Sequence, residues 1–547
     1  MNAFPFLWTL GIWRMTGKMV PPNMSPSQGP RNKSDSLLHK APRGRFNTKR
    51  LVIFVLGVLV LVVAIGTGGS FLYGQYLFGK VHRVVITAEN PQVAGKPINV
   101  LLIGNNTRAG LSPSEAAAFG TTSQVGGGRA DVSMIAHFDP TTKQVTLLSI
   151  PRDLFMPIPG TKNLQRVDAE LNPTSSQSNT ENPNQLVKTI EYDLGIPIQH
   201  YVELNFDTFQ GVVNALGGIK MYFPMQVRDA YSRLNVTTTG CLTLNGAQAL
   251  QVVRTRHLYY LNANGVWVED GLGDLSRTRR DHIFLQVLAE QLKAAGLKNP
   301  VRDLTLLNSV YQDLTLDSTF TESELLSLIL TYRNANPLAA VTGTLPIAYE
   351  NNYIYSGVNY QSVVFPQEPA DSELIHQTLG LITTNISPSN IDLTVVNASN
   401  LANQGTLVAG RLLALGYQVG PPVTLTPLAN PVESVIYYTP GNLAKAEVLR
   451  ASLGGSVIMG QVPSTGYATP LELLAGDQLA VATNLAVPIS TTSNTPATSP
   501  QGPSSTKASP TTTIASHATI SVPDITRGTQ VNTIQQAEPW DPRACPA

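Results

Sequence analysis

Arginine recurs in four short clusters in the middle of this 547-residue chain. The clusters read GGRAD, SIPRD, VVRTR and DLSRTRRD, and they contain Arg129, Arg152, Arg254, Arg256, Arg277 and Arg280. A guanidinium group is planar, permanently charged, and donates hydrogen bonds in a fork that matches phosphate oxygens. Several such groups converging on one point repel each other unless an anion is bound. The clusters therefore predict a binding site for a multiply charged phosphate ligand.

The spacing of these arginines favours convergence. Arg254 and Arg256 are two residues apart, so both point to one face of an extended segment. Arg277 and Arg280 are three residues apart on a predicted helix and share a face. Arg152 follows a proline at the end of an apolar strand, where α/β folds place ligand sites. A single arginine taken alone is better explained as a surface residue paired with a local acid, but Arg152 and the VVRTR pair favour function.

Acid, histidine and motif content narrows the chemistry further. Asp131 precedes the apolar strand VSMIAHF and could hold a divalent cation beside the phosphates, because hard oxygen ligands suit Mg²⁺. The alternative is an ordinary loop acid or a partner of Arg129. His137 and His282 are candidate bases, but their apolar surroundings favour core or surface positions. The chain has no G-x-S-x-G, HExxH or Walker motif, which excludes the commonest hydrolases and NTPases.

The elements that must position these residues alternate between strand and helix patterns. Strands are predicted at 98–104, 132–138, 144–150 and 200–206, and helices at 185–195, 206–218, 276–296 and 322–335. The segment 244–257 is predicted to begin as a helix and to end in the Arg-x-Arg element. This alternation predicts an α/β domain over residues 98–375. A second strand–helix–strand–helix pattern predicts a small α/β module over residues 388–465.

Hydropathy predicts a membrane anchor before the first domain. No charged residue occurs from Leu51 to Gly79, a stretch of 29 residues, which predicts a transmembrane helix at 51–73. The basic arm at 1–50 is predicted to stay in the cytoplasm, with a stalk at 74–97 and the bulk of the chain outside the plasma membrane. A cleaved signal peptide is the alternative, but the run is longer than a typical signal core and no A-x-A site follows closely.

The C-terminal region and the cysteines indicate little further structure. Residues 485–547 are rich in Ser, Thr and Pro and are predicted to be disordered, because they cannot bury enough apolar surface. The two cysteines, Cys241 and Cys545, are far apart in the sequence and form no recognisable disulfide framework. The net charge of +1 and the absence of a basic module exclude an evident nucleic-acid partner.

Five segments of the chain resemble the LytR-CpsA-Psr family in sequence and order. They are INVLLIGNNTR, GGRADVSMIAHFDPTTKQVTLLSIPRDLF, HYVELNFDTFQGVVNALGGI, LNGAQALQVVRTR and DLSRTRR. The resemblance covers roughly 98–300, and the module at 388–465 resembles the LytR C-terminal domain of actinobacterial members. It implies a three-layer αβα sandwich with a central mixed sheet.

The same resemblance implies an activity. Members move a glycan polymer from a polyprenyl-pyrophosphate carrier onto peptidoglycan, leaving a phosphodiester bond, with Mg²⁺ (or Mn²⁺) as cofactor. The likeness to actinobacterial members points to arabinogalactan or another wall polysaccharide as the polymer. The alternative for this chain is a non-catalytic envelope scaffold that binds polyprenyl phosphate.

The resemblance also assigns roles to individual residues. The arginines expected to bind the pyrophosphate are Arg129, Arg152, Arg254, Arg256, Arg277 and Arg280. Asp131 and Arg152 match catalytic positions, and Asp131 and Asn106 match the metal-binding positions.

Three residues of this chain depart from the family pattern. Asn106 replaces the aspartate of G-x-D-x-R, so it offers a carbonyl oxygen but no charge. Asp281 replaces a glutamine, and Arg166 replaces a lysine.

Overall fold

The computed structural model describes residues 75–87, 90–106, 128–171, 182–295, 314–380, 386–425, 431–482 and 537–546. The basic arm predicted at 1–50 and the membrane span predicted at 51–73 lie outside these residues. No helix within the described ranges combines the length and apolar character needed to cross a membrane.

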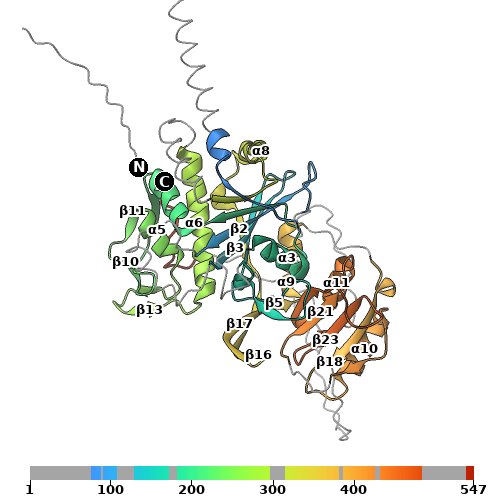
Figure 1. Ribbon diagram of the computed structural model, residues 1–547. Helices are drawn as coiled ribbons and strands as arrows, with labels where there is room; N and C mark the ends of the chain where they lie inside the picture. Colours follow the sequence, from blue (N-terminus) through green and yellow to red (C-terminus); the bar gives the residue numbers. More distant parts are fainter. Residues whose placement is uncertain are drawn as a thin grey trace, which may run out of the picture. The chain divides into compact units, whose positions relative to one another are not determined.

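A mixed seven-stranded sheet lies at the centre of the first domain (Figure 1). Its strands, in spatial order, are β1 (His82–Val84), β14 (Leu314–Asp317), β7 (His200–Leu204), β2 (Ile98–Asn105), β3 (Ala130–Phe138), β4 (Val145–Ile150) and β15 (Val341–Thr344). Strand β2 is parallel to β7 and antiparallel to β3. The prediction of an α/β chain with a central mixed sheet is confirmed.

Helices cover both faces of this sheet. They are α3 (Pro183–Leu194) and α9 (Ala370–Leu379) on one face, and α6 (Asp274–Ala295) and α8 (Glu322–Tyr332) on the other. Successive strand residues point to opposite faces, so Leu101 and Ile135 pack in the core beside α3 and α9. Their neighbours Val100 and Met134 pack with Leu285 of α6 instead. The sheet therefore lies between two helical layers.

The predicted stalk at 74–97 is partly a strand of this sheet. Strand β1 pairs in parallel with β14, and Arg83 donates hydrogen bonds to the backbone carbonyls of Asp317 and Phe320. A three-residue edge strand is too short to give an alternating pattern, so the sequence did not reveal it.

Helix boundaries follow local sequence signals. Helix α3 begins after Asn182, whose side chain accepts from the Gln185 backbone N–H, with proline in its first turn. It ends at Gly195, which is left-handed with φ of 72°. Helix α8 begins with a capping box formed by Thr321 and Glu324. These signals explain why both predicted helices lie close to their observed positions.

A smaller subdomain is inserted between β7 and α6. It contains α4 (Phe206–Ala215), β8 (Ile219–Phe223), β9 (Val227–Asp229), β10 (Leu234–Val236), β11 (Gly240–Leu244), α5 (Gly246–Val253), β12 (Tyr259–Leu261) and β13 (Trp267–Glu269). Helices α4 and α5 pack closely because Gly246 has no side chain. A Cβ atom there would lie 2.5 Å from the carbonyl oxygen of Gln210.

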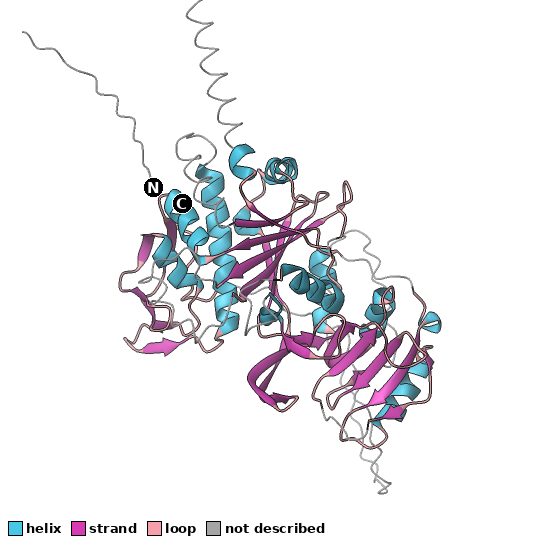
Figure 2. Cartoon of the chain, viewed as in Figure 1, coloured by secondary structure: helices cyan, strands magenta, loops and turns pink. Residues whose placement is uncertain are grey.

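A nine-stranded sheet is built mainly by the C-terminal module (Figure 2). Its strand order is β16 (Ile347–Tyr355), β17 (Val358–Glu368), β22 (Leu453–Gln461), β21 (Ser434–Tyr438), β23 (Leu471–Ala475), β18 (Asp392–Asn397) and β19 (Gln418–Val419), with β20 (Val423–Thr424) and β24 (Ala480–Val481) at its edges. Helices α10 (Gln404–Ala414) and α11 (Leu443–Arg450) pack on it.

The predicted module boundaries, 388–465, are too narrow at both ends. Strand β23 lies between β21 and β18, so the sheet needs residues well beyond 465. At its other side β17 pairs with β22 through Gln367 and Glu368. The hairpin β16–β17, which the sequence analysis did not identify, therefore extends the module's sheet toward the first domain.

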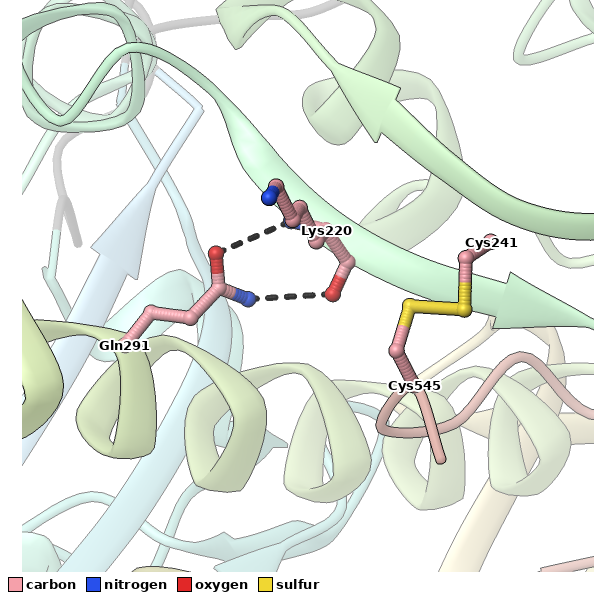
Figure 3. Close-up of a disulfide and its surroundings, with 4 residues drawn as sticks. All are labelled: Lys220, Cys241, Gln291 and Cys545. Atoms are coloured by element: carbon pink, nitrogen blue, oxygen red, sulfur yellow. Dashed lines mark hydrogen bonds between the residues drawn. A yellow bond between two sulfur atoms is a disulfide. The ribbon is translucent and has the colours of Figure 1, made fainter. Parts of the chain in front are cut away.

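The chain's last described residues, 537–546, return to the inserted subdomain. Cys545 forms a disulfide with Cys241 on β11 (Figure 3). In the same view, Gln291 of α6 accepts from the backbone N–H of Lys220 and donates to its carbonyl, which ties α6 to β8. The prediction of disorder to the end of the chain is therefore wrong for these ten residues.

Side chains explain why this terminal segment is ordered. Trp540 stacks on Tyr260 with ring centroids 4.2 Å apart, and Arg543 and Tyr222 exchange two backbone hydrogen bonds. The sequence EPWDPRAC differs in composition from the Ser, Thr and Pro tract before it, because it contains groups that can be buried and paired. The prediction failed because it applied one average composition to both.

Candidate functional site

Three of the predicted arginines converge on Asp131. Arg152 donates from Nη1 to Asp131 Oδ1 at 2.6 Å, and Nη2 of Arg256 lies 3.8 Å from the same oxygen. Arg277 donates to the backbone carbonyl of Asp131 at 2.8 Å. Asp131 lies on β3, Arg152 two residues after β4, Arg256 after α5, and Arg277 in the first turn of α6. Four separate segments thus meet at Asp131.

A β-bulge in β3 positions the side chain of Asp131, and the carboxylate of Asp229 positions the segment that carries Arg256. Gly104 pairs with Val132 and Asn105 with Ala130, so Asp131 is an extra residue in β3. Bulges of this kind change the direction of a side chain, often beside active sites. Asp229 on β9 accepts from the backbone N–H of Arg256 at 3.1 Å and thereby holds the segment that carries it.

Asp274, the first residue of α6, is a second carboxylate in the cluster. It lies 3.0 Å from Nε of Arg256, 3.2 Å from Nη2 of Arg277 and 3.8 Å from Nε of Arg152. Three guanidinium groups therefore share two carboxylates, Asp131 and Asp274. We call these five side chains the open cluster, and they carry one net positive charge.

The pKa values record this imbalance. Burial, and then the like charges of Arg277 and Arg152, lower the pKa of Arg256 to about 10. Burial opposes ionisation of Asp131, yet Arg152, Arg277 and Arg256 together hold its pKa below its ordinary value. Asp131 is thus ionised at neutral pH, while positive charge near Arg256 is incompletely balanced. A bound anion would relieve that repulsion.

Three further ion pairs extend the cluster toward β6 (Leu164–Arg166) and the 3₁₀ helix η1 (Val167–Leu171). Asp153 lies 3.4 Å from Nε of Arg152 and 3.5 Å from Nε of Arg166. Arg129 pairs with Asp168 at 3.3 Å. Arg129 and Arg166 thus come with two further acids, Asp168 and Asp153, so they add no net charge, although Asp153 is shared with Arg152.

Arg254 and Arg280 make other contacts. The guanidinium carbon of Arg254 lies 5.0 Å from the ring centroid of Phe206. Arg280 is buried and donates to Asp270 at 2.9 Å and to the carbonyl of Thr255 at 2.8 Å. The structure therefore does not bring Arg280 to the predicted anion site. Side chains three residues apart on a helix point in directions about 60° apart. This difference is enough to separate Arg280 from Arg277.

Asn106 and Asp131 do not fit a metal ion as they are arranged. Oδ1 of Asn106 accepts from the backbone N–H of Arg129 at 3.0 Å, and the carboxylate of Asp131 contacts guanidinium groups. Among the described residues, no three His, Cys, Asp or Glu side chains gather in a way that could hold a metal ion. Magnesium binds carboxylate and phosphate oxygens, so this donor set is poor, and the Mg²⁺ (or Mn²⁺) requirement stays a prediction.

The two histidines belong to the core. His137 shares a hydrogen bond of 2.7 Å with Asn99 Oδ1, and His282 one of 2.7 Å with Ser149 Oγ. Burial lowers the pKa of both and brings that of His282 to about 4. Neither imidazole contacts the open cluster, so neither supplies a base to it.

The residues that the sequence analysis missed are acids. Asp153 and Asp274 stand inside the arginine motifs, so their proximity to arginine was the available signal, but it suggested neutralisation within each motif. Asp281, the departure from the family pattern, lies 3.9 Å from Nε of Arg277 and is fully buried. Burial raises its pKa to about 7.

Comparisons with known proteins support the family resemblance. The LytR_cpsA_psr family model matches residues 79–370. A relative from Corynebacterium glutamicum, named probable cell wall biosynthesis protein LcpB, is 30% identical over 334 residues, covering 61% of this chain and 71% of the relative.

Two further proteins are similar to about half of this chain. The polyisoprenyl-teichoic acid–peptidoglycan teichoic acid transferase TagU of Enterococcus faecalis is 28% identical over 294 residues, covering 52% of this chain and 84% of the relative. The solved structure of a LytR-Csp2A-Psr enzyme from Actinomyces oris aligns with a TM-score of 0.42 at 26% identity, covering 55% of this chain and 96% of that one.

Proposed function

This chain belongs to the LytR_cpsA_psr family, and from that membership we propose that it is a membrane-anchored extracytoplasmic phosphotransferase. It attaches a glycan polymer from a polyprenyl-pyrophosphate carrier to peptidoglycan through a phosphodiester bond. The names of two relatives support this proposal, since one is a cell wall biosynthesis protein and the other transfers teichoic acid to peptidoglycan. The uncharged run at 51–79 supports a single membrane anchor.

The observation that carries the proposal is the open cluster. Burial and the nearby charges of Arg277 and Arg152 lower the pKa of Arg256, and the three arginines share Asp131 and Asp274. The other two acids nearby do not cancel the excess charge at neutral pH, because Asp153 also pairs with Arg166 and burial raises the pKa of Asp281 to about 7. Such an arrangement costs free energy without a ligand, and a pyrophosphate with several negative charges would stabilise it. A purely structural cluster would be expected to balance its charges.

The reaction follows from positioning and charge neutralisation. A hydroxyl oxygen of a peptidoglycan sugar forms a bond to the phosphorus nearest the glycan. The bond from that phosphorus to the bridging oxygen breaks, and polyprenyl phosphate leaves with the bonding electrons while the hydroxyl proton is released. The three guanidinium groups donate to the phosphate oxygens and stabilise the charge that grows on the leaving phosphate.

Asp131 positions the arginines rather than removing the proton. A general base works best when its pKa is near the working pH, whereas the surrounding guanidinium groups hold the pKa of Asp131 below its ordinary value. Its carboxylate instead holds Arg152 at 2.6 Å. We therefore assign Asp131 to the preorganisation of the anion site.

The test is a reconstituted transfer reaction. The full chain in detergent would be mixed with a polyprenyl-pyrophosphate glycan and a peptidoglycan oligomer, with and without Mg²⁺, and mass spectrometry would detect the phosphodiester-linked product. We expect Arg152→Ala to abolish the product while the protein stays folded, because it removes the guanidinium group that Asp131 holds at 2.6 Å in the open cluster.

A matched control separates this effect from a general loss of arginine. Arg333 is exposed at the end of α8, and Arg333→Ala should retain full activity. Full activity in Arg152→Ala would contradict the proposal. Lipid binding without product by the wild-type chain would favour the alternative, a non-catalytic scaffold that binds polyprenyl phosphate.

A further inference from the structure

A cavity of about 370 Å³ opens beside the open cluster, and the reaction described above makes no use of it. Its polar lining comes from Arg129, Gln165, Arg166, Asn359, Tyr360 and Gln361. One wall is β6 with η1, and the other is the start of β17. At roughly 30 Å³ per water molecule, the cavity has the volume of about a dozen waters, which is room for a sugar ring.

The charges of this cavity are already balanced, unlike those of the open cluster. Arg166 lies 3.5 Å from Asp153 and donates to the carbonyls of Tyr360 and Ser362. Arg129 pairs with Asp168. The cavity therefore does not present the excess positive charge that a second phosphate would need.

The remaining lining suits a neutral ligand with many hydroxyl groups. Gln165, Asn359 and Gln361 contribute side-chain amides, which both donate and accept hydrogen bonds. Tyr360 adds an aromatic ring with a polar tip. Concave sites with a few convergent polar groups are the usual form of small-molecule sites. Sugar rings and their acetamido groups match this mixture.

The cavity is adjacent to the position of the transferring phosphate. Asp153 lies 3.4 Å from Nε of Arg152 and 3.5 Å from Nε of Arg166. One carboxylate therefore links an arginine of the open cluster to an arginine of the cavity wall. We propose that the cavity is a carbohydrate subsite that binds an N-acetylhexosamine ring of a substrate beside the phosphate. This proposal rests on the proposed function and adds the residues that select the sugar.

Backbone strain distinguishes Gln361 within the lining. Its φ is 62°, a left-handed value that is strained for most residues other than glycine. Strain of this kind concentrates at ligand sites, where surrounding structure holds it in place. Asn352, on the same hairpin but outside the cavity lining, has a similar φ of 57°. The pair offers a matched comparison.

The C-terminal module holds both walls of the cavity. Tyr353 of β16 donates to Glu433 at 2.8 Å, which fixes the hairpin. Before β6, Lys162 pairs with Glu472, and Tyr437 donates to the Lys162 carbonyl at 3.1 Å. A site held on both sides is preorganised for its ligand. The module therefore contributes to sugar binding without touching the sugar.

The test uses Gln361→Gly in the full chain. Glycine adopts the same φ without strain, so the variant removes only the side chain, and Asn352→Gly is the control. Transfer kinetics would be measured with donor and acceptor varied in turn. We expect KM for one substrate to rise about tenfold with little change in kcat, as for lost ground-state binding. The substrate affected identifies the sugar as part of the donor or of the peptidoglycan acceptor.

Unchanged KM values for both substrates would overturn the subsite while leaving the transferase intact. If the wild-type chain makes no product, saturation-transfer NMR with N,N′-diacetylchitobiose decides the question separately. A signal lost in Gln361→Gly and kept in Asn352→Gly supports the subsite. Equal signals, or none from the wild-type chain, overturn it. Weaker binding of inorganic pyrophosphate in Gln361→Gly would also overturn it, because the cavity would then belong to the anion site.

Discussion

Two groups of arginines at the start of α6 differ in charge balance and exposure. In the open cluster, Arg152, Arg256 and Arg277 share two carboxylates, and 31% of the Arg256 side chain is exposed. A second group, the closed cluster, consists of Arg279, Arg280, Asp270 and Asp541. It has two positive and two negative charges, and none of its side chains is more than 5% exposed.

The difference separates a binding role from a structural role. In the closed cluster, Arg279 donates to Asp541 at 2.5 Å and to Asp270 at 2.9 Å, and Trp540 donates to the same Asp270 oxygen at 3.2 Å. Every charge has a buried partner, so no site for an anion remains. In the open cluster the partners are too few and solvent has access. Charge balance, rather than the presence of arginine, therefore distinguishes the cluster that we propose binds the ligand.

The largest expected effect comes from removing an arginine of the open cluster. Arg256→Ala should lower kcat/KM about a thousandfold, since one preorganised donor contributes about that much. Its midpoint of thermal unfolding should stay at the wild-type value or rise, because repulsion from Arg277 and Arg152 is relieved. Transfer assays and thermal unfolding would measure both. A large loss of stability with activity retained would reverse the roles of the two clusters.

The second-largest expected effect is a loss of folding stability when a carboxylate of the closed cluster is removed. Asp541→Asn leaves Arg279 and Arg280 with Asp270 as their only carboxylate in that cluster, and unpaired buried charge costs about 3 kcal/mol. Urea unfolding should show this decrease, while Asp392→Asn, at an exposed position on β18, should show none. Equal stability of the two variants would show that the terminal segment does not stabilise the subdomain.

The smallest effect concerns Asp281, which lies between the two clusters. Burial raises its pKa in the folded chain to about 7, against an ordinary value of 3.8 for an aspartate carboxyl group. The folded chain therefore keeps a proton that the unfolded chain loses between about pH 4 and 7, and stability falls as pH rises through that window. Asp281→Asn removes this dependence. It should be more stable than the wild-type chain at pH 8 and nearly equal to it at pH 4.

Unfolding curves at the two pH values would test this prediction. The comparison is between variant and wild type, because burial also raises the pKa of Glu170 and Glu191 to about 7 and they contribute the same slope in both. Asp392→Asn serves again as the control. A variant that matches the wild-type chain at pH 8 would place the pKa of Asp281 near its ordinary value.

Regular elements with strong periodicity were predictable, and irregular ones were not. The apolar runs of β2, β3 and β4 and the helix at α6 lie within a few residues of their predicted bounds. The hairpin β16–β17 was missed, because its exposed residues do not alternate cleanly and Asn352, Ser356 and Gln361 are left-handed. A composition-based expectation also missed the ordered segment at 537–546.

The sequence by itself predicted the type of chemistry, since the forked, permanently charged guanidinium groups of its arginine-rich motifs match phosphate oxygens. It also determined the core strands, because periodicity is a local property. The tertiary structure decided which arginines act together. Arg277 meets Asp131 across 146 residues, and Arg279 meets Asp541 across 262. Coulomb interactions depend on distance in space, so a balanced and an unbalanced cluster look alike in the sequence until folding brings their partners together.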